Sequence, residues 1–523
     1  MIGRIFTVGG FTLLSRITGF VRDIVLAAIL GAGPVADAFF VALRLPNHFR
    51  AIFAEGAFNS AFLPTYARIR QQDGADPSKL FADRIFTLLF IIQAILLAVA
   101  LIFTPAVISV LAPGFAQDGE RFKLAVELTR ITFPYLLLVS LVTLYGGILN
   151  ALERFATAAA APILLNLSMI AALSLAFLFP TAGHAAAWGV LLAGCLEVLL
   201  LATDARRQGV LPAFRWPRVD REVKLFLKRF GPATLGSAGT QIALFADTII
   251  ASFLATGALS ALYYADRLNQ LPIGVIGIAV GTVLLPEMAN RLAQGDEGGA
   301  RHAQNRAIEF TLLLSIPCLV AFVLLPDLIM RALFARGAFT TADAAAAGAT
   351  LRAYAIGLLP FVLLRSASTT FLARGDTWKP VKALFFAVLI NVALKVLLYD
   401  PYAQVGLAFA TSIGGWVNVA LLTWFAHRAG LFVFETEVIR SAMRLAVAGL
   451  VLALVLWLAD APVRALLAGR AFQDELALTL LGLIGAVAYG ATVMVLFGRR
   501  WLARFGGARP RAQTPPLPPD AAS

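Results

Sequence analysis

Long apolar stretches, separated by shorter polar segments, dominate the chain. Runs such as "LLFIIQAILLAVALIF" (88–103) and "AVAGLVLALVLWLA" (446–459) approach or reach, with their flanks, the roughly 20 residues that a membrane-spanning helix needs. Membrane-spanning strands would instead give short segments in which apolar and polar residues alternate. The pattern therefore predicts an all-α integral membrane protein.

Counted along the chain, the apolar stretches predict about fourteen membrane spans. Their predicted positions are 5–30, 36–66, 83–112, 124–150, 157–180, 185–203, 226–256, 260–290, 309–334, 345–373, 381–399, 404–427, 439–459 and 475–498. The first stretch contains Arg16, Arg22 and Asp23, so it lacks the uninterrupted apolar core of a signal peptide. We expect it to remain as the first helix.

Composition supports a membrane protein and argues against a large soluble enzyme. The chain is 60% hydrophobic and 14% charged, with a mean hydropathy of +0.83, whereas soluble proteins average about 45–50% apolar and about 25% charged. The net charge of +13 does not indicate nucleic-acid binding, because the basic residues lie mainly in the loops between spans. Cys195 and Cys318 both lie in apolar segments and indicate no disulfide framework.

The loops alternate between two kinds, and this alternation predicts the orientation. Segments such as "DARRQGVLPAFRWPRVDREVKLFLKR" and the tail "GRRWLARFGGARPR" are strongly basic, whereas "GAGPVA" and "ATGALS" are short and contain no Lys or Arg. Lys and Arg mark the cytoplasmic side of a membrane protein. Both termini are therefore expected in the cytoplasm, which agrees with an even number of spans. The Pro-rich end, 501–523, is expected to be a disordered cytoplasmic tail.

The chain also repeats itself after about six spans. Asp23 matches Asp247 and Gly33 matches Gly257, each 224 positions on (247 − 23; 257 − 33). Arg44 matches Arg267 (267 − 44 = 223), and Pro64 matches Pro286 (286 − 64 = 222). A weaker echo pairs "LERFATAAAAPILLN" with "LARGDTWKPVKALFFAVLIN". An even number of spans per repeat keeps both repeats in the same orientation, a layout known among transporters.

This repeat predicts the domain organisation. We expect an N-terminal six-helix lobe at 1–205, a basic cytoplasmic linker at 206–225 and a second six-helix lobe at 226–430. Two additional membrane helices follow at 431–500, before the tail at 501–523.

Several motifs, in one order along nearly the whole chain, resemble the MviN/MurJ family of lipid II flippases. They are "SRITGFVRD", "GAGPVADAFFVALRLPN", "RAIFAEGAFNSAFLP", "APGF", "ITFPYLLLVSL", "GGILNALERF" and "LYYADRLNQLPIGVIGIAVGTVLLPEMA". The family belongs to the multidrug/oligosaccharidyl-lipid/polysaccharide exporter superfamily. The resemblance implies two six-helix lobes in a V-shaped arrangement around a central cavity, with the last two helices forming a groove for the undecaprenyl tail.

The resemblance also implies a function in peptidoglycan and cell-wall biogenesis. Lipid II, an undecaprenyl-pyrophosphate-linked disaccharide-pentapeptide, would be flipped from the cytoplasmic to the outer leaflet of the bacterial inner membrane by alternating access. The expected partners are lipid II, membrane lipids and cell-wall synthesis proteins, with no nucleic acid, and the chain is expected to be a monomer.

Charged residues inside the first apolar stretches are the candidate substrate-binding residues. A charge at the bilayer centre is costly and normally faces a bundle interior or a wet cavity, and arginine offers a planar fork of donors for phosphate oxygens. The family pattern places essential residues at positions corresponding to Arg16, Arg22, Arg50, Arg267 and Asp37. A second group of candidates consists of Arg44, Glu55, Asp23 and Asp266.

Geometry on the first two predicted helices refines these candidates. Arg16 and Arg22 lie six residues, or about 120°, apart on an ideal helix, whereas Arg16 and Asp23 share a face and could form an internal pair. Arg16 and Arg22 could also reach the membrane surface by snorkelling. Arg44 and Arg50 could simply flank a proline-kinked helix.

The remaining charged residues have structural interpretations too, and the sequence leaves these alternatives open. Arg267 follows Asp266 directly, so the two could form a structural charge cluster. Asp37 opens the second predicted span and could cap it, while Asp23 and Glu55 are suited to hold arginines in place. Three further basic residues are interpreted as structural or snorkelling: Lys395, Arg352 and Arg365.

No enzyme motif, catalytic residue or metal site is predicted. The sequence contains no G-x-x-x-x-G-K-[ST] pattern for nucleotide phosphates, and its four histidines are scattered without ligand spacing. No cofactor is therefore expected, and the membrane potential or an ion gradient is the expected energy source.

Two other functions compete with lipid II flipping. A drug/cation antiporter of the same superfamily would favour acidic residues in its cavity, whereas arginine predominates in the first lobe. A cell-wall assembly scaffold or glycan polymerase would need an extracytoplasmic catalytic domain, but the external loops are too short to form one.

Overall fold

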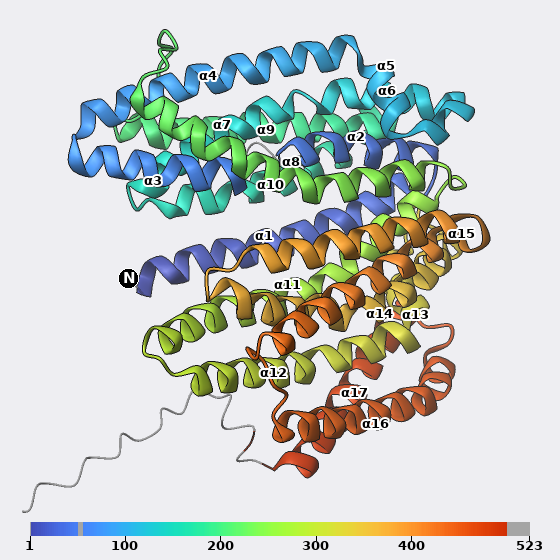
Figure 1. The fold of residues 1–523 in the computed structure, drawn as a ribbon. Helices are drawn as coiled ribbons and strands as arrows, with labels where there is room; N and C mark the ends of the chain where they lie inside the picture. Colours follow the sequence, from blue (N-terminus) through green and yellow to red (C-terminus); the bar gives the residue numbers. More distant parts are fainter. Residues whose placement is uncertain (1, 51–55, 499–500, 502–523) are drawn as a thin grey trace, which may run out of the picture. The chain divides into compact units, whose positions relative to one another are not determined.

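A computed structural model describes residues 2–50, 56–498 and 501, and among these residues it contains helices and no strand (Figure 1). The predicted all-α fold is confirmed. The helices of the first half are α1 (Ile2–Leu30), α2 (Pro34–Arg50), α3 (Gly56–Gln72), α4 (Ala75–Ile102), α5 (Thr104–Leu111), α6 (Gly119–Thr132), α7 (Tyr135–Ala151), α8 (Phe155–Ser174) and α9 (Ala182–Arg207). Those of the second half are α10 (Arg221–Ser252), α11 (Ala258–Ala293), α12 (Glu297–Leu324), α13 (Pro326–Phe334), α14 (Thr341–Leu372), α15 (Trp378–Arg428), α16 (Thr436–Leu467) and α17 (Gln473–Phe497).

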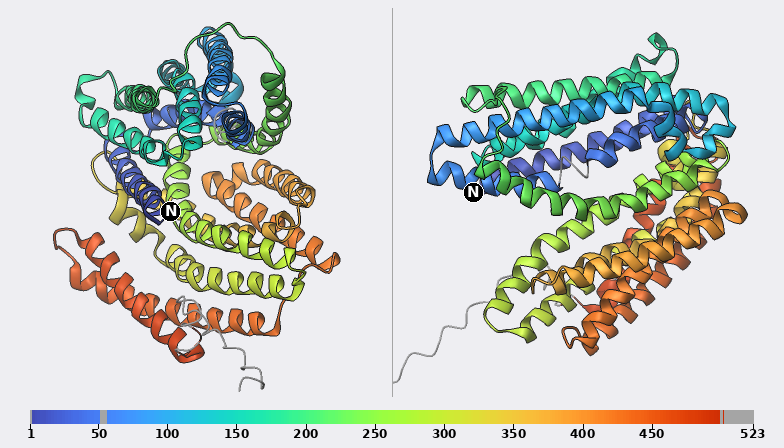
Figure 2. Two further views of the ribbon diagram at one scale, coloured as in Figure 1. Left: turned by 90° about the vertical axis from the view of Figure 1, so that its left-hand side faces the viewer. Right: turned by 45° about the horizontal axis from the view of Figure 1, so that its top comes forward.

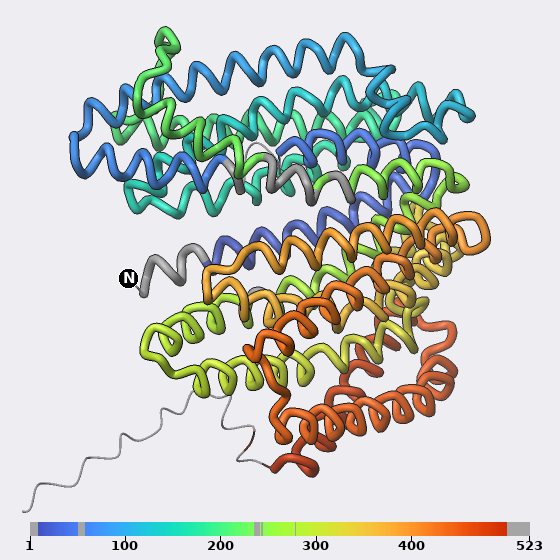
Figure 3. Tube along the Cα trace, in the orientation of Figure 1, coloured from blue at the N-terminus to red at the C-terminus, as the bar shows by residue number. Residues whose placement is uncertain are grey.

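Ten helical segments of the described chain are long and apolar enough to cross a membrane. One of them, α15, has 51 residues and would extend roughly 77 Å if straight, more than twice the roughly 30 Å of a hydrocarbon core. Ala403, with a φ of 45°, interrupts α15, and Gly406 packs on Leu398 beyond the interruption. The Cα trace turns back there (Figure 3), so α15 provides two helical segments, as predicted at 381–399 and 404–427.

The count of fourteen spans remains a prediction, because it requires α1, α2 and α10 to cross the membrane too. These helices are not among the ten. Helix α2, with 17 residues, is too short by itself. Helices α1 and α10 carry Arg22 and Asp247, and charged side chains lower the mean hydropathy by which spans are recognised.

Two predicted helix ranges need correction. The range 309–334 is broken at Leu325, between α12 and α13, whereas the range 36–66 includes residues outside the described part of the chain and remains a prediction. The range 83–112 is broken at Phe103, between α4 and α5. Pro105 follows in the first turn of α5, a position where proline fits because its missing N–H would be unpaired in any case.

The predicted internal repeat is confirmed by the helix bounds. Helices α4 and α12 both have 28 residues, and α12 begins 222 positions after α4 (297 − 75). The short helices α5 and α13 start at the same spacing (326 − 104), as do α6 and α14 (341 − 119). In the turn after α1 the glycine with positive φ is Gly31 (66°), whereas in the matching turn of the second repeat it is Gly257 (90°), the sequence match of Gly33.

The chain divides into two compact units. Unit 1 comprises Met1–Leu271, Pro326–Gly357 and Ala383–Asn418, and unit 2 comprises Pro272–Leu325, Leu358–Lys382 and Val419–Ser523. Helices α11, α14 and α15 therefore contribute residues to both units. The domain bounds expected from the repeat, 1–205 and 226–430, remain a prediction.

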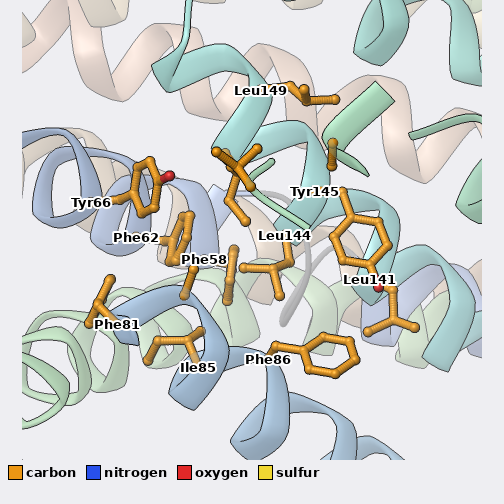
Figure 4. Packing of buried hydrophobic residues seen from close by; sticks show 14 of the residues in the cluster. Phe58, Phe62, Tyr66, Phe81, Ile85, Phe86, Leu141, Leu144, Tyr145 and Leu149 are labelled. Atoms are coloured by element: carbon orange, nitrogen blue, oxygen red, sulfur yellow. The ribbon is translucent and has the colours of Figure 1, made fainter. Parts of the chain in front are cut away.

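An aromatic core packs the first helices of unit 1 together (Figure 4). Phe58, Phe62 and Tyr66 recur every four residues along one face of α3, and all three are buried. Phe62 stacks on Phe58 at 5.2 Å and on Phe81 of α4 at 5.7 Å between ring centroids. Such aromatic pairs contribute about 0.5–1.5 kcal/mol each beyond the area that they bury.

In unit 2, α16 and α17 form a hairpin, and α16 packs against α12 (Figure 2). Gly449 permits this close approach, because a Cβ atom there would meet Ile316 at 2.7 Å. The hydroxyl of Tyr489 on α17 donates a hydrogen bond to the carbonyl oxygen of Leu313 at 2.8 Å. Many outer residues of the hairpin are exposed and apolar, including Leu450 and Trp457, as expected for helices in contact with lipid.

Candidate functional site

Unit 1 contains a group of charged side chains between α1 and α11. Arg22 donates to Asp23 Oδ1 from Nε at 3.1 Å and from Nη2 at 2.7 Å. Its Nη1 donates to the amide oxygen of Asn166 on α8 at 3.0 Å. The Arg22 and Asp23 side chains are only 12% and 7% exposed. The guanidinium is therefore oriented by two polar partners inside the helix bundle.

Helix α11 completes this group with Tyr263 and Arg267. These residues lie one turn apart on the same helix face. The Tyr263 hydroxyl donates to Asp23 at 3.4 Å, and the Arg267 guanidinium lies 4.9 Å from the centre of the Tyr263 ring. Tyr263 is buried, whereas Arg267 is exposed. We call Arg22, Asp23, Tyr263 and Arg267 the cationic cluster.

The structure corrects one predicted pair on α1. Asp23 is paired with its neighbour Arg22 and not with Arg16. Arg16 lies in the same helix, where it is half-buried. Between the two arginines, Gly19 lies against the Asn166 side chain, which a Cβ atom would contact at 3.4 Å. The small residue thus permits α8 to approach α1 where Arg22 needs its partner.

A second group of polar residues joins α2 to α10. Arg44 Nη1 donates to Thr248 Oγ1 at 3.2 Å, and His48 Nδ1 lies 3.0 Å from the Gln241 amide oxygen. Arg44 is half-buried and His48 is buried. These contacts are spaced one turn apart on α2 and two turns apart on α10, so they form a polar seam between the helices.

Next to this seam, Asp247 of α10 forms an ion pair with Lys395 of α15. Lys395 is almost completely buried, whereas the Asp247 side chain is 30% exposed. The structural interpretation of Lys395 from the sequence agrees with this position, but the sequence did not predict its partner.

Asp37 lies at a helix terminus and not in an open cavity. It is fully buried and accepts hydrogen bonds from the backbone N–H groups of Gly257 at 2.8 Å and Ser260 at 3.0 Å. The Ser260 hydroxyl donates to it at 2.6 Å, and Arg121 lies 3.8 Å away. A carboxylate at a helix N-terminus pairs otherwise unsatisfied amides. Asp37 therefore caps α11, and not the helix on which it lies.

The other candidates lie at separate places. Arg50 ends α2, where it interacts electrostatically with the buried Glu197 of α9. Asp266 is half-buried and accepts a hydrogen bond from Gln270 at 3.4 Å. Glu55 lies outside the described residues.

Sequence reasoning missed Asn166, Tyr263 and Glu197. Asn166 could have been found, because it ends the first member of the echoed pair of segments and Asn391 ends the second. Tyr263 and Glu197 carry no comparable signal, since a tyrosine or a single glutamate in an apolar helix becomes informative only when its neighbours are known.

The cationic cluster is suited to bind an anionic group. It offers one buried guanidinium held in a fixed orientation and one exposed guanidinium, and guanidinium groups bind phosphate oxygens through paired N–H donors. Among the described residues, no group of three or more His, Cys, Asp or Glu side chains could hold a metal ion.

Comparisons with known proteins cover most of the chain. A family model described as lipid II flippase MurJ matches residues 26–472. A probable lipid II flippase MurJ of Rhizobium tropici is 42% identical over 457 residues, which are 86% of each chain. A lipid II flippase MurJ of Burkholderia cenocepacia is 34% identical over 461 residues, 86% of this chain and 88% of its own.

Solved structures show the same architecture. A structure of lipid II flippase MurJ in an inward closed conformation superposes with a TM-score of 0.80 at 25% identity, covering 95% of this chain and 99% of that one. An inward-facing multidrug resistance MATE family transporter gives a TM-score of 0.66 at 16% identity over 80% of this chain and 95% of its own. The second likeness concerns the fold alone.

Proposed function

The chain belongs to the lipid II flippase MurJ family, and from this membership we propose that it moves lipid II from the cytoplasmic to the outer leaflet of the bacterial inner membrane. On this proposal it is a transporter and not an enzyme. Alternating access is the proposed mechanism, because a polar headgroup cannot cross the hydrocarbon core without a protein-lined path.

The observation that carries the proposal is the cationic cluster. The pyrophosphate of lipid II is the part of the cargo that least tolerates an apolar surrounding. Arg22 is held by Asp23 and Asn166, while Arg267 is exposed on α11. We propose that Arg267 meets the pyrophosphate first and that Arg22 binds it more deeply, exchanging its contact with Asp23 for the phosphate oxygens. Tyr263 would then keep a hydrogen bond to Asp23.

Arg16, Arg44 and Arg50 are proposed to extend this basic surface along α1 and α2. Asp37 has a different proposed role. Because it caps α11 through buried hydrogen bonds, it would hold the end of α11 that follows the short loop 253–257. That loop contains no Lys or Arg, so we propose that it lies on the outer side of the membrane.

The orientation, the tail site and the energy source are also proposals. The basic loops support a cytoplasmic location for both chain termini. The apolar hairpin of α16 and α17 is proposed to provide the groove for the polyprenyl tail. Transport is proposed to depend on the membrane potential or an ion gradient, since moving one charge through 100 mV releases about 2.3 kcal/mol.

The test is transfer of fluorescent lipid II by the purified chain in liposomes. Wild-type protein should expose labelled lipid II to an impermeant quencher faster than empty liposomes do. Undecaprenyl-phosphate-linked sugar, which lacks the pyrophosphate, is the control cargo and should cross at the background rate. Equal rates for both cargoes would contradict selection by the pyrophosphate.

A further inference from the structure

An apolar pocket of about 480 Å³ lies in unit 1, and one of its lining residues is Leu45, which follows Arg44 in α2. It is lined by α2 (Leu45 and Phe49), α4, α5 (including Ala106) and α10 (Phe245). Its volume falls within the roughly 300–1,000 Å³ typical of ligand sites. All its lining side chains are apolar.

One rim of this pocket, which we call the α5 pocket, consists of residues suited to contact lipid. Val99 is 48% exposed and Val110 is 68% exposed, on two consecutive apolar helices. The helix break at Phe103 and the small side chains of Ala100 and Ala106 leave space at this point. A hydrocarbon chain could therefore enter from the bilayer without crossing a polar surface.

The other rim adjoins the polar seam between α2 and α10. Leu45 and Phe49 each follow a seam residue directly, Arg44 and His48. Phe245 lies on α10 between the seam residues Gln241 and Thr248. The His48 ring lies 4.6 Å from the Phe245 ring, and its buried Nε2 has no hydrogen-bond partner in the described part of the chain. The apolar pocket thus adjoins the turns of α2 that carry a guanidinium and this buried, unpaired ring nitrogen.

We propose that the α5 pocket binds the first isoprene units of the polyprenyl chain, next to the pyrophosphate, while Arg44 contacts the phosphate. This inference rests on the proposed lipid II transport. In a polyprenyl pyrophosphate the hydrocarbon begins directly at the phosphate, whereas a glycerol ester separates the two in a phospholipid. Adjacent Arg44 and Leu45 fit the former arrangement.

The experiment fills the pocket with a large side chain and measures chain-length preference. Ala106→Trp places an indole in the α5 pocket. The matched control is Ala98→Trp, because Ala98 is exposed on α4 but does not line the pocket. Purified full-length proteins are compared for binding two lipid II analogues, one with a C15 prenyl chain and one with a C5 chain. Thermal unfolding midpoints establish that both variants fold.

Wild type and Ala98→Trp should bind the C15 analogue at least about tenfold more tightly than the C5 analogue, since additional buried methylenes strengthen binding. Ala106→Trp should reduce this preference to about threefold or less and leave binding of the C5 analogue unchanged. An unchanged preference in Ala106→Trp would overturn the proposal. Equal competition by phosphatidylglycerol would also overturn it, by assigning the pocket to bulk phospholipid. If the proposed transport of lipid II were wrong, wild type itself would bind neither analogue. That result differs from an unchanged chain-length preference in Ala106→Trp.

Discussion

The two sequence repeats have nearly the same helix bounds, yet they hold their matching aspartates differently. In the first repeat, Asp23 pairs with Arg22 on the same helix, and the two side chains are 7% and 12% exposed. In the second repeat, Asp247 of α10 pairs with Lys395 of α15, with side chains 30% and 2% exposed. The aspartate occupies the same position in both repeats, whereas the basic residue that pairs with it comes from a different helix in each.

This difference indicates which of the two ion pairs can rearrange to bind the transported lipid. Arg22 can exchange Asp23 for an anion while no helices separate, because both residues belong to α1. Lys395 cannot leave Asp247 without breaking a contact between two helices, and it would remain as an unpaired buried charge. We therefore interpret the first pair as part of substrate binding and the second as part of the scaffold.

The largest expected effect is on transport by Arg22→Ala. On the proposed mechanism, the variant loses charge-assisted hydrogen bonds to the pyrophosphate, each worth about 1.5–3 kcal/mol, so lipid II flipping should fall by at least about 100-fold. Arg22→Lys keeps the charge without the planar fork and should recover only part of the activity. The measurement is the liposome transfer assay, together with the amount of folded protein in the membrane.

A fall in protein abundance that parallels the fall in flipping would make Arg22 a structural residue like Lys395. Full activity of Arg22→Lys would show that charge alone matters. Asp23 retains the Tyr263 hydroxyl as a donor but loses its cation, so the Ala variant should also lose some stability. Flipping is therefore compared per amount of folded protein, and it should fall far more than the abundance does.

The next effect is on stability, in the second repeat. Lys395→Met leaves Asp247 without its cation and should lower the free energy of unfolding by about 2 kcal/mol, below the roughly 3–5 kcal/mol of a fully buried pair. The expected loss of stability is smaller than for a fully buried pair because the Asp247 side chain is 30% exposed. Unfolding in detergent should reveal the loss, and Lys395→Met/Asp247→Asn should restore most of it.

If Lys395→Met abolished flipping and left stability unchanged, Lys395 would be a substrate residue and the contrast between the repeats would disappear. If the double variant were no more stable than the single one, the ion pair would not be the source of the loss.

A smaller effect is expected at Asp37, which pairs amides at the start of α11 in the second repeat. Asp37→Ala removes an N-terminal cap and should cost about 1–2 kcal/mol, while Asp37→Asn keeps one acceptor and should cost less. Hydrogen exchange at the amides of Gly257 and Ser260 should accelerate most in the Ala variant. Unchanged exchange at both amides would contradict the capping role.

The smallest expected effect concerns the helix N-caps at matching positions of the two repeats. These caps are Asp118 before α6 and Thr340 before α14. Asp118 accepts bonds from the backbone N–H and the guanidinium of Arg121, and these bonds lower its pKa from the ordinary value of 3.8. Its stabilising contribution is therefore present above that value and is lost as the pH falls through the lower, folded-state pKa. Thr340 forms reciprocal bonds with Asp343 at the same spacing.

The thermal midpoint of wild type should exceed that of Asp118→Ser by a small amount at about pH 7, and the difference should shrink at about pH 3. Serine keeps an uncharged cap, so it isolates the contribution of the carboxylate. A difference that does not change with pH would show that the charge of Asp118 is irrelevant to the cap.

The sequence by itself determined the fold class, the internal repeat and several candidate site residues of this protein. The all-α membrane fold follows from the length of its apolar runs, because a chain in lipid must satisfy its backbone hydrogen bonds internally. The repeat followed from matching charged residues, glycines and prolines, and the helix bounds confirm it. Arg22 and Arg267 could be selected from sequence, because charges inside apolar stretches are costly enough to indicate a role and because the motifs resemble a known family.

Only the tertiary structure decided which charges meet. Asp23 had two candidate arginines on its own helix, and spacing favoured Arg16, yet Asn166 on α8 and Tyr263 on α11 complete the group around Arg22. Asp37 looked like a cap for its own helix or a ligand, but it binds amides more than 200 positions away, at Gly257 and Ser260. Helical periodicity specifies the face of one helix, whereas partners depend on how several helices pack, and that information is distributed over residues far apart in the chain.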